Sequence, residues 1–145
     1  MEYWFSTLYR AIDAMAMDGF LAGLTEDVEV TFGNQPTLKG KADVQKGIGA
    51  FWQSIRGLTH HFVNVIESGC HSTLEAKVDY VRADGRVVAI PCVTMLTREG
   101  ELVRSLRIYI DIGPVYEPID RMLVPARPQL CGVDRALVSD AAVMS

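Results

Sequence analysis

Several familiar signatures are missing from this 145-residue chain. Cysteine is scarce, and Cys70, Cys92 and Cys131 show no Cys-x-x-Cys spacing, which argues against a zinc site or a disulfide framework and predicts reduced thiols in the cytoplasm. No basic stripe with interleaved aromatic residues occurs, and the formal net charge is -4, so the composition argues against nucleic-acid binding. No apolar run is long enough for a membrane span.

Other motifs are missing as well. There is no glycine-rich phosphate loop, and no serine or threonine lies in a nucleophile-elbow context. The first fifteen residues lack the pattern of a signal peptide, so we expect a cytoplasmic protein. The chain has 49% hydrophobic and 22% charged residues, as is ordinary for a globular domain with its own core.

Helical periodicity dominates the first part of the chain. Residues 2–18 predict a helix that ends at Asp18-Gly19, and residues 20–24 predict a short second helix. Residues 40–58 predict a third helix, weakened by two glycines. The buried stripe predicted for the first and third helices comprises Phe5, Leu8, Ile12, Met15, Ile48, Phe51, Trp52 and Ile55.

Strand patterns follow. Residues 28–32 alternate and precede a loop, and from residue 58 the chain is β. The later strands are predicted at residues 58–68, 73–82, 86–97 and 101–112. Glycine-containing turns separate them, which predicts an antiparallel meander, and Pro91 predicts a bulge or a bend in the third of these strands.

The order of two helices, a strand, a helix and four strands resembles the nuclear transport factor 2-like superfamily, and within it the SnoaL-like polyketide cyclases, limonene epoxide hydrolases and ketosteroid isomerases. The resemblance rests on "LYRAIDAMAMDGFLAGLTEDVEVTFGNQP", "GKADVQKGIGAFW" and "VRSLRIYIDIGPVY", and it covers roughly residues 5–116. It implies a cystatin-like α+β fold, a cone-shaped half-barrel whose curved antiparallel sheet wraps three helices around a deep apolar pocket. Residues 1–116 would form this domain, and residues 117–145 a tail packing on the body or on a partner subunit. The convex face would form a homodimer.

The resemblance to limonene epoxide hydrolases is partial. Their first acid and their arginine correspond to Asp79 and Lys77, whereas their second acid is replaced by Ile108. Of their tyrosine and asparagine pair, Phe32 has lost the hydroxyl and Asn34 keeps the amide. Such a set would position water less well than the full set.

The ketosteroid isomerase pattern matches less. Its helical tyrosine corresponds to Tyr9, but its general base falls on Phe32 and its second acid near Val93 or Thr94. That mechanism needs carboxylic acids at these places, and neither is found.

The resemblance implies that the side chains of Lys77 and Asp79 point towards the pocket. Asp79 would then act as a general base whose charge Lys77 maintains, while the alternative is a solvated salt bridge on an exposed strand face. His60 and His61 should point to opposite faces, so one of them is expected to face the pocket as an acid or base, unless it is only a core or interface histidine. Asn34 would donate a hydrogen bond to a substrate oxygen, or would simply be a turn residue.

The remaining candidates line the pocket or the outer face. Arg107, Tyr109 and Asp111 are expected on the convex side, at the dimer interface. The predicted substrate-binding residues are Tyr9, Phe32, Trp52, Ile90, Cys92, Thr94, Leu106 and Ile108.

The predicted protein is therefore an enzyme without metal or organic cofactor. It would bind an apolar small molecule that is polyketide-, terpenoid- or steroid-like, and catalyse its acid–base isomerisation or cyclisation. Two alternatives stay open at this point. One is an epoxide hydrolase-like enzyme with an incomplete site, and the other is a non-catalytic ligand-binding or assembly module.

Overall fold

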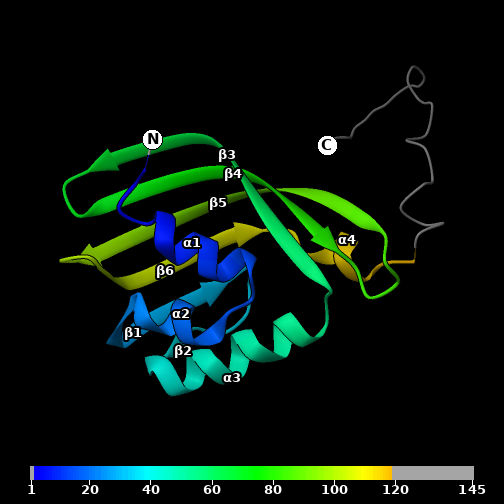
Figure 1. Ribbon diagram of the computed structural model, residues 1–145, viewed down its shortest axis with the longest axis horizontal. Coiled ribbons are helices and arrows are strands. Elements are labelled where there is room, and N and C mark those ends of the chain that lie inside the picture. The colour runs from blue at the N-terminus through cyan, green and yellow to red at the C-terminus, as the bar shows by residue number, and fades with distance from the viewer. Residues whose placement is uncertain (1, 119–145) are drawn as a thin grey trace, which may run out of the picture.

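The computed structural model describes residues 2–118, in which helices cover one face of a six-stranded sheet (Figure 1). The predicted order of helices and strands is confirmed, with a short strand (β2) and a short final helix (α4) in addition. The elements are α1 (Ser6–Asp13), α2 (Met17–Ala22), β1 (Leu24–Phe32), β2 (Leu38–Lys39), α3 (Gly40–Gln53), β3 (Gly57–Ser68), β4 (His71–Val81), β5 (Val87–Glu99), β6 (Leu102–Ile110) and α4 (Gly113–Tyr116).

The helices differ from the prediction in where they end. Residues 2–18 do not form one helix, because the chain turns at Met15, whose φ of 51° lies in the left-handed region. The predicted break at Asp18-Gly19 is wrong, since both residues lie inside α2. Gly19 serves close packing instead: a Cβ at this position would lie 3.0 Å from the Cβ of Ala11 in α1. The third helix is shorter than predicted and ends at Gln53.

The sheet has the strand order β2-β1-β6-β5-β4-β3. Strands β3 to β6 form the predicted antiparallel meander, and its turns contain Gly69, Gly85 and Gly100, each with a positive φ that suits glycine. The sheet is mixed rather than purely antiparallel, because β1 pairs parallel to β6 with Val30 opposite Leu106. The predicted α+β fold, a curved sheet around the helices, is confirmed (Figure 1).

Of the bulge or bend predicted at Pro91, the bulge is absent. The β4–β5 register runs without a shift through Lys77 and Pro91. On the other side of β5, pairing with β6 begins only at Cys92 and Ile110, so Pro91 lies just beyond the end of that ladder. The register shifts of the meander occur elsewhere, between Phe62 and Asn64 in β3 and between Thr97 and Arg98 in β5.

Alternation along β4 separates the core from the outer face. Leu74, Ala76, Val78 and Tyr80 are buried beneath the helices, whereas the residues between them face outward and are more exposed. No helix within residues 2–118 is long and apolar enough to cross a membrane. The predicted tail, residues 117–145, lies outside the described residues from residue 119 onward.

Candidate functional site

A small apolar cavity lies between the helices and the inner face of the sheet. The space inside it that water-sized molecules can occupy is about 40 Å³. Its walls come from α1, α2 and α3 and from strands across the sheet, so the fold as a whole builds the site. The lining residues are Tyr9, Ile12, Phe20, Phe32, Ile48, Phe51, Trp52, Leu58, His60, Tyr80, Cys92, Thr94, Leu106 and Ile108.

His60 is the histidine that faces this cavity. Its backbone pairs with Val78, a fully buried residue, and its side chain is 10% exposed. The next residue, His61, points to the outer face with a side chain that is 58% exposed. The alternation expected for neighbours on a strand therefore separates the two imidazoles.

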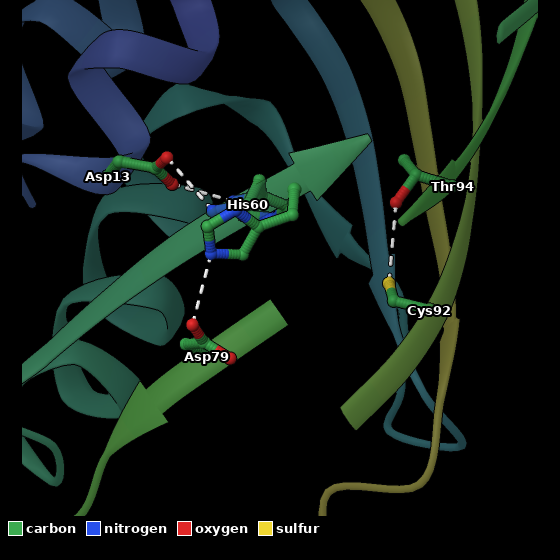
Figure 2. Close-up of polar contacts among 6 residues, drawn as sticks. Asp13, His60, Asp79, Cys92 and Thr94 are labelled. Carbon is green, nitrogen blue, oxygen red and sulfur yellow. Dashed lines mark hydrogen bonds and ion pairs between the residues drawn. The ribbon is translucent and has the colours of Figure 1, made fainter. Parts of the chain in front are cut away.

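Asp13, the last residue of α1, holds His60 through two hydrogen bonds (Figure 2). One carboxylate oxygen lies 2.6 Å from His60 Nδ1, and the other accepts the His60 backbone N–H at 3.0 Å. Because a carboxylate only accepts hydrogen bonds, Nδ1 carries the hydrogen in the neutral ring, and Nε2 keeps a free lone pair. Nε2 has no hydrogen-bond partner among the described residues, so it is the ring nitrogen available to a ligand.

Hydroxyl groups complete the polar part of the cavity. Tyr9 packs edge-on against the His60 ring, with centroids 4.8 Å apart, and its hydroxyl hydrogen-bonds Thr94. Burial raises the pKa values of the Tyr9 and Tyr80 hydroxyls far above their ordinary range, so both stay protonated and able to donate. Thr94 also lies 3.7 Å from the Cys92 sulfur, and burial raises the pKa of this thiol (Figure 2). Cys92 is therefore protonated and acts as a wall rather than as a nucleophile.

The expected orientation of Lys77 and Asp79 is wrong. Both lie on the outer face of β4, and neither contributes to the cavity. Asp79 accepts a hydrogen bond from His61 at 3.0 Å, and the two side chains are 40% and 58% exposed. The reason is the period of the strand: the same alternation buries Val78 and Tyr80, so Lys77 and Asp79 must face water. The solvated pair is the arrangement that the structure shows.

The other predicted site residues divide into two groups. Asn34 is exposed and lies at a surface depression beyond Phe32, outside the cavity. Ile90 is buried at 4% exposure on the inner face but does not line the cavity. The remaining predicted lining residues are found in the cavity wall, namely Tyr9, Phe32, Trp52, Cys92, Thr94, Leu106 and Ile108. Arg107 and Tyr109 pair with Met95 and Val93 on the outer side of the sheet.

Sequence reasoning missed Asp13 and Tyr80. A signal for Asp13 was present, because it follows Tyr9 by four residues in a helix and so points to the same side. Tyr80 directly follows Asp79 in β4, so the expectation that Asp79 faces the pocket would have turned Tyr80 away from it. Among the described residues no group of three or more His, Cys, Asp or Glu side chains is arranged to hold a metal ion.

Comparison with known protein families finds a match to this sequence. The family model described as a SnoaL-like domain matches residues 5–106. No curated protein matches the chain in sequence.

Solved structures share the fold at low sequence identity. An NTF2-like protein of unknown function from Burkholderia pseudomallei K96243 is 19% identical, with a TM-score of 0.70 over 84% of this chain and 95% of that one. TerC, co-crystallized with polyporic acid, is 17% identical, with a TM-score of 0.70 over 81% of this chain and 95% of that one. A protein with a ketosteroid isomerase-like fold from Catenulispora acidiphila DSM 44928, in complex with trimethylamine, is 17% identical, with a TM-score of 0.70 over 79% of this chain and 90% of that one.

Proposed function

The chain belongs to the SnoaL-like domain family, and on that premise we propose that it is an acid–base enzyme acting on an apolar small molecule that carries a carbonyl group. The observation that carries the proposal is the pairing of His60 with Asp13 beside an otherwise apolar cavity. A histidine held in one tautomer by a carboxylate is suited to taking and returning a proton.

The proposed reaction begins at the carbon next to the substrate carbonyl. His60 Nε2 removes a proton from this carbon. The electron pair of the broken C–H bond forms a carbon–carbon double bond, and the π electrons of the carbonyl move onto its oxygen, which gives an enolate. Asp13 stabilises the imidazolium that results. The imidazolium then returns the proton, either to another carbon, which gives an isomer, or to an oxygen after the enolate carbon has attacked a second carbonyl, which gives a ring.

The enolate oxygen requires donors. The cavity wall contains three hydroxyl groups that can donate a hydrogen bond to this oxygen, those of Tyr9, Tyr80 and Thr94. The raised pKa values of the two tyrosines support it, because each hydroxyl keeps the hydrogen that it must donate. In a cavity with few competing water molecules, such donors stabilise developing negative charge more strongly than they would in water.

The apolar wall supports the substrate class. The wall is formed by aliphatic side chains such as Leu58 and Leu106 and by three phenylalanines and a tryptophan. It offers a ligand no charged partner other than His60, which Asp13 holds. TerC, which shares the fold, was co-crystallized with the organic small molecule polyporic acid, and this agrees with a small-molecule ligand. A second copy of the chain against the outer face stays a prediction, which sedimentation of the purified protein tests.

Exchange of ketone protons tests the proposal. Acetone dissolved in D₂O with the wild-type protein should gain deuterium next to its carbonyl, as measured by NMR. His60→Gln should reduce this exchange by about 100-fold or more, the usual contribution of a general base. His61→Gln is the matched control and should change the rate by less than about twofold, because exposed residues away from a site rarely matter. Equal rates for the two variants would refute the proposal.

A further inference from the structure

A second, larger hollow lies beside the cavity. Its volume is about 500 Å³, and it shares Phe32, Ile48 and Phe51 with the cavity wall. The Phe32 and Phe51 rings contact each other with centroids 4.8 Å apart. These side chains therefore form a partition, with the His60 cavity on one side and this groove on the other.

The two spaces differ greatly in size. The cavity offers about 40 Å³ and the groove about 500 Å³. One water molecule needs roughly 10–15 Å³ of the space that a water-sized sphere can occupy. The cavity therefore holds about three water molecules. Only the small end of a substrate fits beside His60, and any larger part must lie elsewhere.

The groove has the chemistry to take that larger part. Its walls include Pro36, Leu38, Ala50 and Ile112. Its hydroxyl groups at one end are already satisfied: Ser54 donates to the Phe51 carbonyl at 2.6 Å, and the Tyr116 hydroxyl lies 2.6 Å from the Ser54 oxygen. Since the Ser54 hydrogen is used, the Tyr116 hydroxyl is the donor to Ser54. An apolar ligand would leave none of these groups without a partner.

We propose that the groove is a second subsite, and that the substrate is an elongated ketone whose reactive carbonyl lies near one end. The carbonyl end enters the cavity past Phe32 and Phe51, and the apolar chain lies in the groove. The inference rests on the proposed function for the identity of the carbonyl end. The groove itself rests on the wall residues that it shares with the cavity and on the difference in volume. Both rings of the partition are only partly buried, which leaves them space to turn aside.

Binding of ketones of increasing length to the full chain tests the subsite. The dissociation constants of acetone, 2-hexanone and 2-nonanone are measured by the change in tryptophan fluorescence, since Trp52 lines the cavity. Burial of each added methylene should tighten binding by about threefold to fourfold. We expect 2-nonanone to bind at least about 30-fold more tightly than acetone, allowing for incomplete burial. Equal affinity along the series would overturn the proposal.

A matched pair of variants tests whether the alkyl chain of the ketone lies in the groove. Ala50 is exposed and lines the groove but not the cavity, whereas Ala42 is exposed on the same helix and lines neither. Ala50→Trp should weaken 2-nonanone binding by about tenfold and leave acetone binding within about twofold, as expected when about two methylene contacts are lost. Ala42→Trp should change neither. An equal effect of Ala50→Trp on both ketones, or none on either, would show that the alkyl chain of the ketone does not lie in the groove.

The same titrations in His60→Gln separate this inference from the proposed function. If length-dependent binding persists while proton exchange is equal in His60→Gln and the wild type, the subsite stands and the proposed function fails. If exchange depends on His60 but affinity does not depend on length, the function stands and the subsite fails. The wild-type series needs no variant, so a folding defect in Ala50→Trp does not remove the test.

Discussion

The two faces of the β3–β4 hairpin carry the same pair of residue types in different surroundings. On the inner face His60 binds Asp13 at 2.6 Å, with side chains that are 10% and 27% exposed. On the outer face His61 binds Asp79 at 3.0 Å, with side chains that are 58% and 40% exposed. In water such a pair contributes little, because solvent and salt screen it. Beside the cavity the same pair fixes a tautomer and presents a base, so burial rather than residue type makes the difference.

The largest difference between the faces should appear in folding stability. Leu74 is 1% exposed on the inner face of β4, and Lys77 is exposed on its outer face. Leu74→Ala should lower the free energy of unfolding by about 2–5 kcal/mol, because it removes buried methyl groups and leaves a cavity. Lys77→Ala should change it by less than about 0.5 kcal/mol. Urea denaturation followed by circular dichroism measures both, and a large loss for Lys77→Ala would mean that the faces are assigned wrongly.

The two aspartates should differ nearly as strongly in their effect on catalysis. Asp13→Asn keeps the shape of the side chain but removes the charge that orients His60 and stabilises its imidazolium, so acetone proton exchange should fall by about 100-fold. Asp79→Asn is the control on the outer face and should stay within about twofold of the wild type. Thermal melting of both variants shows whether they remain folded. A loss with Asp79→Asn that matches the loss with Asp13→Asn would contradict the account.

A smaller contrast is expected between two thiols. Burial raises the pKa of Cys92, whereas Cys70 is exposed in the turn between β3 and β4. At pH 8 a raised pKa leaves less of the reactive thiolate, and burial also limits access to it, so iodoacetamide should label Cys70 at least about tenfold faster. Mass spectrometry of the digested protein gives the rate for each cysteine. Equal labelling would show that the cavity wall opens readily to solvent.

The smallest effect should come from the outer pair itself. A double-mutant cycle with His61→Ala and Asp79→Ala should give a coupling free energy below about 0.5 kcal/mol, because both side chains are well exposed. Repeating the urea titrations at high salt should reduce the coupling further. A coupling above about 2 kcal/mol, the range of buried networks, would show that the pair is shielded from water.

Much of the fold followed from the sequence because its signals are local. Alternation from residue 58 onward and the glycines at 69, 85 and 100 predicted the meander that the structure contains. The break between the first two helices was misplaced, because Gly19 suggested a helix end and instead allows close packing against Ala11. The parallel pairing of β1 with β6 joins segments far apart in the chain, and no local pattern reports it.

The site was less predictable for a reason of geometry. Alternation in β4 separates Lys77 and Asp79 from Val78 and Tyr80, but it does not say which set faces inward. Partial resemblance to epoxide hydrolases favoured Asp79, and the resulting choice of face was wrong. The contact between Asp13 and His60 spans 47 positions in the chain and depends on how α1 crosses β3. The helical spacing from Tyr9 indicates which side of the helix Asp13 lies on, but it does not indicate that His60 is the partner of Asp13.

The most direct test of the account is the protonation of the two ring nitrogens of His60. Nitrogen-15 NMR of histidine-labelled protein, with His60→Gln used to assign the signals, distinguishes a nitrogen that carries hydrogen from one that does not. In the neutral ring the account predicts hydrogen on Nδ1, bonded to Asp13, and a free lone pair on Nε2. Addition of 2-nonanone should perturb Nε2 more than Nδ1. Hydrogen on Nε2 in the neutral ring would contradict the claim that His60 presents a base to the cavity.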